Sequence, residues 1–363
     1  MGPDPAVAAV RLGVRRSLAG LTGTAQAQPG PHQTGLNQTG PNQAGPGQTG
    51  ASVLSTHDEP LVLAACSGGP DSLALAAALA FEAPRLGVRA GGITVDHSLQ
   101  PGSAQRATWV AATLRELGLD PVASVRAEVT GRGDDGAYPG PEAAARQARY
   151  AVIEAAAVEF GATAVLLGHT LDDQAETVLL GLARGSGARS LAGMQGVAGR
   201  YLRPLLGLRR TETIAACAAQ GLEPWDDPHN ADPAFARTRV RQQILPLMED
   251  LLGPGIAEAL ARTADGLRAD ADALDGLADE AAERITSTDG GLEVTALAEL
   301  PAAIRTRVLR RAAIAAGAPA GSLNAGHITQ LDALVMKWRG QRGTDLPGGL
   351  RCVRRYGRLQ FTT

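Results

Sequence analysis

The sequence is poor in several residue types, and each shortage narrows the choice of protein class. Aromatic residues make up 3% of its 363 residues, so the core must consist mainly of aliphatic and alanine side chains. The three cysteines, Cys66, Cys217 and Cys352, are far apart and odd in number, which excludes a disulfide scaffold and a C-x-x-C zinc site. No run approaches the roughly 18 apolar residues that cross a bilayer, and the first residues lack the order of a signal peptide. We therefore expect a cytoplasmic protein with no membrane contact.

Net charge is also small, at −3, so the chain as a whole is not predicted to attract nucleic acid. One segment differs, because residues 337–358 contain seven basic residues and a single acidic one, Asp345, with Trp338 and Tyr356 among them. Such a patch attracts phosphate groups. A solvated surface that balances acidic segments elsewhere is equally consistent with this pattern.

Low-complexity sequence separates the N-terminal residues from the rest of the chain. Residues 5–21 place apolar side chains at helical spacing and predict an amphipathic helix. Between residues 24 and 57 a Gln-x-Gly unit repeats every five residues, and a composition so rich in Gly, Pro, Gln and Thr buries too little apolar surface to fold. We predict four regions: an N-terminal helix at 1–23, a flexible tether at 24–57, a first domain at 58–247, and a mainly helical C-terminal domain with a basic tail at 248–363.

From residue 60 onward, short apolar runs alternate with helical patterns. The predicted strands are 61–66, 92–95, 122–129 and 164–167, and the predicted helices are 71–81, 104–117, 142–159 and 172–182. This alternation predicts an α/β fold with a parallel sheet and helices on both faces. Ligands of such sheets bind beyond the carboxyl ends of the strands, so the turns after Cys66, Val95 and Leu167 should form one site. Near the C-terminus, residues 345–361 predict a small hairpin.

The strongest local signal follows the first strand, where the chain reads Ser67-Gly68-Gly69-Pro70-Asp71-Ser72. Glycines let backbone N–H groups approach a ligand, and the N-terminus of the following helix favours an anion. Ser67 and Ser72 add hydroxyl groups, so this segment predicts a cradle for pyrophosphate. It contains no lysine, so Mg²⁺ must neutralise the phosphates, and Asp71 is its natural ligand. The alternative is a structural turn in which Ser67 or Ser72 caps the helix.

Two further strand ends carry polar side chains. Asp96 and His97 end the second strand, where the base and ribose of a nucleotide would lie, although a simple turn explains them as well. After the fourth strand the chain reads GHTLDDQAET, in which Asp173 and Glu176 share one helix face. Such a pair can bind Mg²⁺ or an ammonium group, whereas acids favoured by the helix dipole are the structural alternative. Arg184 follows in a glycine-rich turn suited to phosphate.

These motifs carry a family resemblance. The segment 67–72 resembles the pyrophosphate loop of N-type ATP pyrophosphatases, the PP-loop superfamily. The segment 168–177, the Ala-Arg-Gly-Ser-Gly turn at 183–187 and the pair Gly193-Met194 closely resemble the tRNA(Ile)-lysidine synthase family. Residues 142–150 and 227–246 match two more of its patterns, with His229 and Thr238 departing from the family's Ser and Asn. The matching positions are Arg146, Arg149, Tyr150, Asp227, Asn230, Arg237, Arg241 and Pro246.

The resemblance implies a Rossmann-like PP-loop domain, a smaller C-terminal domain that contacts tRNA, and a reaction. Members use ATP to adenylate C2 of the wobble cytidine, position 34, of the isoleucine tRNA with a CAU anticodon. Free L-lysine then displaces AMP and forms lysidine. The implied nucleotide and Mg²⁺ site consists of Ser67, Gly68, Gly69, Pro70, Asp71 and Ser72, with Asp173 as a second metal ligand and Asp96, His97 and His169 at the nucleotide. The implied catalytic and substrate residues are Asp71, Arg146, Asp173, Glu176, Arg184, Arg237 and Arg241.

Other functions share the same loop and stay open at this point. A tRNA thiolase usually needs paired cysteines, an amidating synthetase would release AMP without tRNA, and an RNA-binding protein without activity would not need the loop and the acidic pair. The sequence leaves the oligomeric state undecided, with a homodimer as one possibility, and it does not rank Asp172 against Asp173.

Overall fold

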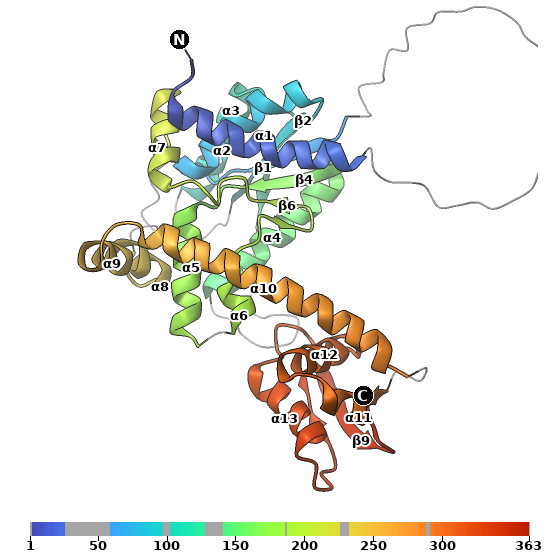
Figure 1. Cartoon of the computed structure of the whole chain (residues 1–363). Coiled ribbons are helices and arrows are strands. Elements are labelled where there is room, and N and C mark those ends of the chain that lie inside the picture. Colours follow the sequence, from blue (N-terminus) through green and yellow to red (C-terminus); the bar gives the residue numbers. More distant parts are fainter. Residues whose placement is uncertain are drawn as a thin grey trace, which may run out of the picture. The chain divides into compact units, whose positions relative to one another are not determined.

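The computed structural model describes residues 2–25, 59–96, 102–127, 141–185, 187–225, 232–287 and 291–362 (Figure 1). The tether expected at 24–57 lies outside this part of the chain, except for its first two residues, which end helix α1 (Pro5–Ala25). The chain divides into two compact units. The first contains residues 1–180 and 194–261, and the second contains residues 181–193 and 262–363.

A six-stranded sheet forms the centre of the first unit. Its strands are β1 (Leu61–Ala65), β2 (Arg89–Asp96), β3 (Val122–Arg126), β4 (Ala162–Leu167), β5 (Val197–Ala198) and β6 (Tyr201–Leu202), in the order β3-β2-β1-β4-β6-β5. The pairs from β3 to β6 are all parallel, and only β5 runs antiparallel, at the edge. The predicted α/β fold with a mainly parallel sheet is therefore confirmed.

Helices cover both faces of this sheet because β1 alternates its buried side chains. Val62 and Ala64 belong to one apolar cluster, and Leu61 and Leu63 belong to another. The first cluster packs against α1, α2 (Pro70–Glu82), α3 (Ser103–Glu116) and α7 (Arg210–Ala219), and the second packs against α4 (Pro141–Glu159). The N-terminal helix belongs to the core, since its buried valines lie in the first cluster and Arg15 makes a two-pronged ion pair with buried Glu82.

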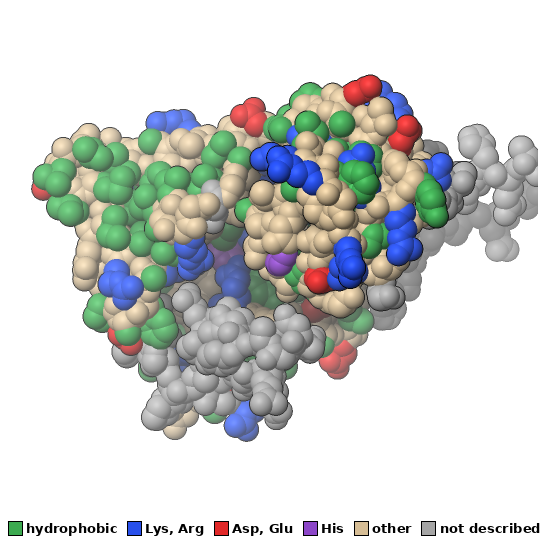
Figure 2. All heavy atoms as spheres, turned by 90° about the horizontal axis from the view of Figure 1, so that it is seen from below, with side chains coloured by type: hydrophobic (Ala, Val, Ile, Leu, Met, Phe, Trp, Pro, Cys, Tyr) green, Lys and Arg blue, Asp and Glu red, His purple; other side chains and the backbone are tan. Residues whose placement is uncertain are grey.

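A run of short helices completes the first unit. α8 (Ala236–Arg239), the π-helix η3 (Val240–Ile244), α9 (Leu245–Leu252) and the start of α10 (Ile256–Ile285) follow one another. Val240 and Leu245 pack against Leu171 and Ala175 of α5 (Leu171–Ala183), which holds α8 and η3 beside α5. On and next to α9, the apolar side chains of Ile244, Leu247, Leu251 and Leu252 are exposed. Figure 2 shows hydrophobic side chains gathered at its left edge, where α8 and α9 lie.

The second unit packs helices on a small antiparallel sheet. Its strands, in the order β7-β10-β9-β8, are β7 (Leu292–Glu293), β10 (Arg358–Thr362), β9 (Arg351–Arg355) and β8 (Thr344–Asp345). Its helices include α6 (Ala188–Leu191), α11 (Val294–Glu299), α12 (Ala302–Ala315) and α13 (Ala325–Met336). The predicted C-terminal hairpin is confirmed, since β9 pairs with β10 across Tyr356 and Gly357, which both have positive φ, as a tight two-residue turn requires. Within the described residues, no helix is long and apolar enough to span a membrane.

Candidate active site

The loop between β1 and α2 presents the start of a helix without a side-chain cap. α2 begins at Pro70 with Gly69 as its N-cap, and no side chain of the described residues bonds to its first amides. Ser72 stabilises the loop itself, because its hydroxyl accepts from the Ser67 amide at 3.2 Å and donates to the Gly69 carbonyl at 2.9 Å. Neither serine caps the helix, so the capping alternative is wrong. The N-terminal end of α2 can accept an anion.

Close backbone packing brings the end of β4 next to this loop. A Cβ on Gly168 would lie 3.1 Å from the backbone of both Asp71 and Ser72, so only glycine fits without a shift. Gly68 has φ +88°, and a Cβ there would lie 2.9 Å from a methyl group of Val110. These contacts place the first turn of α5, which follows Gly168 closely, beside the first turn of α2.

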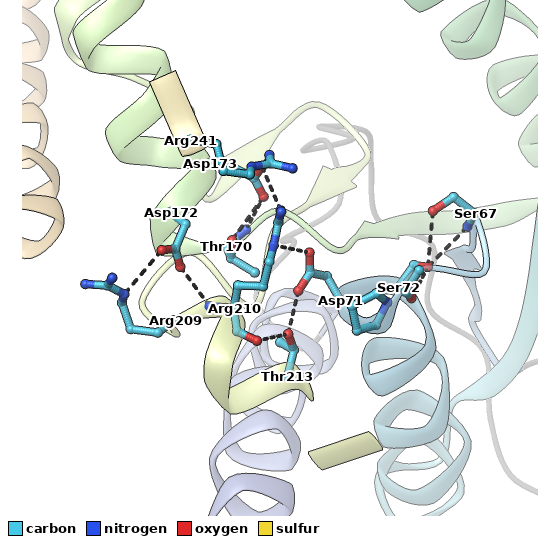
Figure 3. A network of polar contacts seen from close by, with 12 residues as sticks. Ser67, Asp71, Ser72, Thr170, Asp172, Asp173, Arg209, Arg210, Thr213 and Arg241 are labelled. Carbon is cyan, nitrogen blue, oxygen red and sulfur yellow. Dashed lines mark hydrogen bonds and ion pairs between the residues drawn. The ribbon is translucent and has the colours of Figure 1, made fainter. Parts of the chain in front are cut away.

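Three carboxylates and two guanidinium groups then form a chain of contacts, of which Figure 3 labels Asp71, Asp173, Arg210 and Arg241. Arg210 Nε lies 3.1 Å from Asp71 Oδ2, and its Nη2 lies 3.3 Å from Asp173 Oδ1. Arg241 Nη2 donates to the same Asp173 oxygen at 3.1 Å. Arg241 also grips Glu176 with two bonds, of 2.6 and 3.0 Å. The order is therefore Asp71, Arg210, Asp173, Arg241, Glu176, and we call these five residues the acid–arginine chain.

Neutral and charged neighbours hold this chain in place. Thr213 donates its hydroxyl to Asp71 Oδ1, and Thr170 donates both its amide and its hydroxyl to Asp173 Oδ2, at 2.9 and 3.1 Å. Asp172 faces elsewhere, because it accepts the Arg210 amide at 2.7 Å and pairs with Arg209. The structure thus separates the two adjacent acids: Asp173 lies in the acid–arginine chain, and Asp172 anchors the start of α7.

Burial and paired charges act against each other on the acids. Burial raises the pKa of Asp71 and of Glu176, and the arginines beside them oppose that rise. At Asp173 burial also acts to raise the pKa, but Arg210, the Thr170 amide and Arg241 outweigh it, so the pKa is lowered. Burial lowers the pKa of His169 to about 4, which keeps its imidazole neutral near pH 7.

Three buried nitrogen atoms at this site have no hydrogen-bond partner among the described residues. They are Nδ1 of His169 and Nε of Arg210 and Arg237. Arg237, on α8, lies near Glu176 at 3.7 Å and donates weakly to Thr177 at 3.3 Å. The two arginine nitrogens still lie within ion-pair distance of Asp71 and Glu176, so Nδ1 of His169 is the atom of the three that a polar ligand can complete.

The structure brings some of the expected residues together and leaves others apart. Asp71, Asp173, Glu176, Arg237 and Arg241 meet, and His169 lies four residues before Asp173. Asp96 ends β2, where its carbonyl accepts the Ala127 amide at 2.8 Å. Positions 97 and 226–231 lie outside the described residues, so His97, Asp227, His229 and Asn230 are not placed.

Two expected arginines, Arg146 and Arg184, are not members of the acid–arginine chain. Arg146 on α4 donates to the Tyr150 hydroxyl at 3.2 Å and lies over its ring at 5.0 Å. Arg184 is exposed just after α5 and belongs to the second unit. Conversely, sequence reasoning missed Arg210, Thr213 and Thr170. Arg210 lies 139 residues after Asp71 and belongs to no motif. Only Glu212, whose carboxylate accepts the Arg209 amide at 2.7 Å, marks the helix start beside it.

Comparisons with known proteins match two family models and several relatives to this chain. The family model of the PP-loop domain matches residues 48–248, and the model of the TilS substrate binding domain matches residues 292–360. The tRNA(Ile)-lysidine synthase of Thermobifida fusca is 54% identical over 358 residues, covering 99% of this chain and 98% of the relative. That of Streptomyces coelicolor is 57% identical over 362 residues, covering 99% of both.

Among solved structures, one similar to this chain is the U34-tRNA thiolase NcsA from Methanococcus maripaludis with its [4Fe-4S] cluster. The superposition covers 60% of this chain and 75% of the thiolase chain, with 19% sequence identity and a TM-score of 0.48. We infer nothing about function from a likeness at that level. The relatives above do not favour a thiolase or an amidating synthetase. Two domain matches and near full-length identities above 50% show that the chain belongs to the tRNA(Ile)-lysidine synthase family.

Proposed function

We propose that this protein is a ligase that forms a carbon–nitrogen bond between L-lysine and C2 of cytidine 34 in the isoleucine tRNA with a CAU anticodon. In the first step the C2 oxygen attacks the α-phosphorus of ATP and pyrophosphate leaves. In the second step the lysine amine attacks C2, AMP leaves with the oxygen, and lysidine forms. The observation that carries the proposal is the acid–arginine chain beside an uncapped α2 N-terminus, in a chain of this family.

The loop 67–72 is the proposed pyrophosphate site. The amides at the start of α2 carry partial positive charge, and the exposed Ser67 adds a hydroxyl group. Ser72 is proposed to support the loop, because its hydroxyl donates to the Gly69 carbonyl. A neutral His169, with Nδ1 buried and without a partner among the described residues, would accept or donate a hydrogen bond at the nucleotide. Asp96, at the carboxyl end of β2, and His97 are proposed for the same role.

The residues present fit a magnesium ion held together with ATP. Asp71 and Asp173 both contact the one guanidinium of Arg210, so the two carboxylates lie at one place in the fold. In the part of the chain that the structure describes, no group of three or more His, Cys, Asp or Glu could hold a metal without further ligands. This matches the usual Mg²⁺ site of one or two carboxylates plus substrate phosphates. When bound there, Mg²⁺ would neutralise the phosphates and the departing pyrophosphate.

We assign the lysine substrate to the Asp173–Glu176 end of the acid–arginine chain. Asp173 and Glu176 lie together, and the Glu176 carboxylate is fully buried. Their negative charge complements the ammonium group of lysine, which would share them with Arg241. Arg237 and Arg241 are proposed to face the RNA substrate. Arg146 is proposed to stabilise negative charge at the adenylation step and Arg184 to contact phosphate, although the structure joins neither to the acids.

The second unit supports binding of tRNA. A cavity of about 490 Å³ lies on its small sheet, lined by Gln341, Arg342, Arg351, Val353, Arg354, Arg355, Gln360 and Thr362. None of these described lining residues is acidic. Arg354 also lies 4.7 Å from the ring of Trp338, which is partly exposed. The cavity therefore suits phosphate groups of RNA, in the segment where the sequence shows its basic patch.

Mass spectrometry of the tRNA tests the proposed function. Isoleucine tRNA with a CAU anticodon is incubated with the full-length protein, ATP, Mg²⁺ and isotopically labelled lysine. We expect labelled lysine on cytidine 34, and its loss with Asp71→Asn but not with the control Asp250→Asn, which changes an exposed acid on α9. Unmodified cytidine 34 with the wild-type protein would contradict the proposal.

A further inference from the structure

Arg210 occupies the position between the two carboxylates that are proposed to hold Mg²⁺. Its Nε lies 3.1 Å from Asp71 Oδ2 and its Nη2 lies 3.3 Å from Asp173 Oδ1. Figure 3 shows its side chain extending from the start of α7 to these two acids. The backbone of Arg210 is fixed, because Asp172 accepts its amide at 2.7 Å. Only the side chain is therefore able to change partners.

The two arginines of the acid–arginine chain are held very differently. Arg241 donates Nε and Nη2 to the two oxygens of Glu176, which is the strong parallel fork of an arginine–carboxylate pair. Arg210 has no such fork. Its Nε is buried, and although Asp71 is near, the geometry gives no hydrogen bond. Its Nη2 donates one hydrogen bond to Asp173, which at 3.3 Å is longer than the 2.7–2.9 Å typical of charged pairs. Arg210 thus neutralises two acids through charge more than through directed bonds.

The need for a cation at this point follows from the two acids themselves. Asp71 and Asp173 are both largely buried, and each lies close to the other's charge. Two buried carboxylates repel each other unless a positive group lies between them. In this structure Arg210 supplies that group from the chain itself.

We propose that Arg210 is the resident counter-cation of Asp71 and Asp173 and gives up this position to the divalent cation that arrives with ATP. The inference rests on the proposed function for ATP and Mg²⁺. It makes Arg210 a positioning residue, whose guanidinium turns to the phosphates when the metal takes the carboxylates. ATP offsets the lost contacts between Arg210 and the two acids in two ways: its phosphates provide further ligands for the metal, and they provide new partners for Arg210. A divalent cation without ATP must displace Arg210 with no such compensation, so it binds weakly.

Binding of Mn²⁺, used in place of Mg²⁺, tests this inference. Electron paramagnetic resonance measures unbound Mn²⁺ in the presence of full-length wild type, Arg210→Met, Arg210→Lys or the control Arg209→Met. Arg209 is the neighbouring arginine and pairs with Asp172 and Glu258, not with the two acids of the metal site. Without ATP, we expect Arg210→Met to bind Mn²⁺ about tenfold or more tightly than wild type, because two buried carboxylates lose their cation. Arg210→Lys and Arg209→Met should stay within about threefold of wild type.

A second measurement uses α,β-methylene ATP, which cannot release pyrophosphate. This analogue should strengthen Mn²⁺ binding to wild type strongly and to Arg210→Met much less, since the metal site of the variant is already open. If Arg210→Met does not fold, as judged by circular dichroism, Arg210→Gln replaces it in both measurements.

Equal Mn²⁺ affinities for folded Arg210→Met and wild type without ATP would overturn the inference. In that case Arg210 is only a structural ion pair. This outcome is separate from failure of the proposed function, because wild type that makes lysidine can still fail the Mn²⁺ comparison. Wild type that makes no lysidine overturns the proposed function and leaves the Mn²⁺ comparison readable.

Discussion

Arginine has opposite roles at two places in this protein, the acid–arginine chain of the first unit and a cavity of the second unit. In the first unit, Arg210 and Arg241 lie among buried acids, so each guanidinium is neutralised within the fold. In the second unit, four arginines line a cavity whose described lining residues include no acid. Arg351 pairs with Asp345 outside that lining, and Arg354 donates to the last carbonyls of α13.

The difference shows that arginine can either position neighbouring groups or attract phosphate, depending on whether acids neutralise its charge. A buried pair is not a dependable source of stability, yet removing one partner is costly because the other charge stays unpaired. Paired arginines therefore fix the positions of reacting groups. Arginines that face solvent without acids nearby keep their positive field, which draws phosphate and weakens as salt increases. Substitutions of Arg241 and of the cavity arginines test the two sides of this contrast.

The largest effect is expected from breaking the strongest buried pair. Arg241→Met leaves the fully buried Glu176 carboxylate without its two-pronged partner. The free energy of unfolding, measured by urea denaturation, should fall by about 3–5 kcal/mol. Arg241→Met combined with Glu176→Gln should recover part of this loss, whereas Arg239→Met, at an exposed neighbour on α8, should cost less than about 1 kcal/mol. A small loss for Arg241→Met alone would show that the pair does not constrain the first unit.

The next effect concerns pH. Burial lowers the pKa of His169 to about 4, below its ordinary value of 6.5. Between these pH values the unfolded chain binds a proton that the folded protein does not, so stability is kept above pH 6.5 and falls as the pH drops towards 4. The contribution is up to about 3 kcal/mol. His169→Gln should therefore unfold with a flatter pH dependence between pH 6.5 and 4, as followed by urea titrations. An unchanged slope would mean that His169 is not buried in its neutral form.

A smaller effect is expected from the backbone contact that joins the loop to β4. The methyl group of Gly168→Ala would meet the backbone of Asp71 and Ser72 at 3.1 Å. Overpacking of this kind costs about 1–3 kcal/mol and should displace the loop, so ATP affinity measured by calorimetry should fall with stability. Gly207→Ala is the matched control, because its new Cβ meets nothing within 4 Å. If Gly168→Ala binds ATP as tightly as wild type, the contact between Gly168 and the loop does not position the nucleotide site.

The smallest effect is expected in the second unit. Arg342→Ala and Arg355→Ala should each weaken tRNA binding by about three- to tenfold and reduce the slope of log Kd against log salt by about 1. Stability should stay unchanged, in contrast with Arg241→Met, since surface substitutions usually change it by less than about 0.5 kcal/mol. Arg16→Ala on α1 is the control, as it changes an exposed arginine that is not among the residues lining the cavity. Slopes equal to that of wild type would exclude the cavity as a phosphate site.

Sequence patterns predicted those parts of the site that depend on local spacing. The loop 67–72 stands between a strand and a helix, and Asp173 and Glu176, three residues apart on α5, both contact Arg241. Partners that only the fold brings near could not be predicted in this way. Arg210 and Thr213 start a later helix and reach Asp71 only because α7 packs on α2. The two-residue strands β5 and β6 are too short to give a periodic signal.

The dependence of AMP formation on both substrates tests the central claim most directly. Radiolabelled ATP is incubated with the full-length protein, and the nucleotide products are separated with lysine and the CAU-anticodon isoleucine tRNA present together, singly or not at all. The account predicts AMP and pyrophosphate in the complete mixture and no sustained AMP release when either the tRNA or lysine is left out. Formation of ADP, or AMP release that does not depend on RNA, would contradict it.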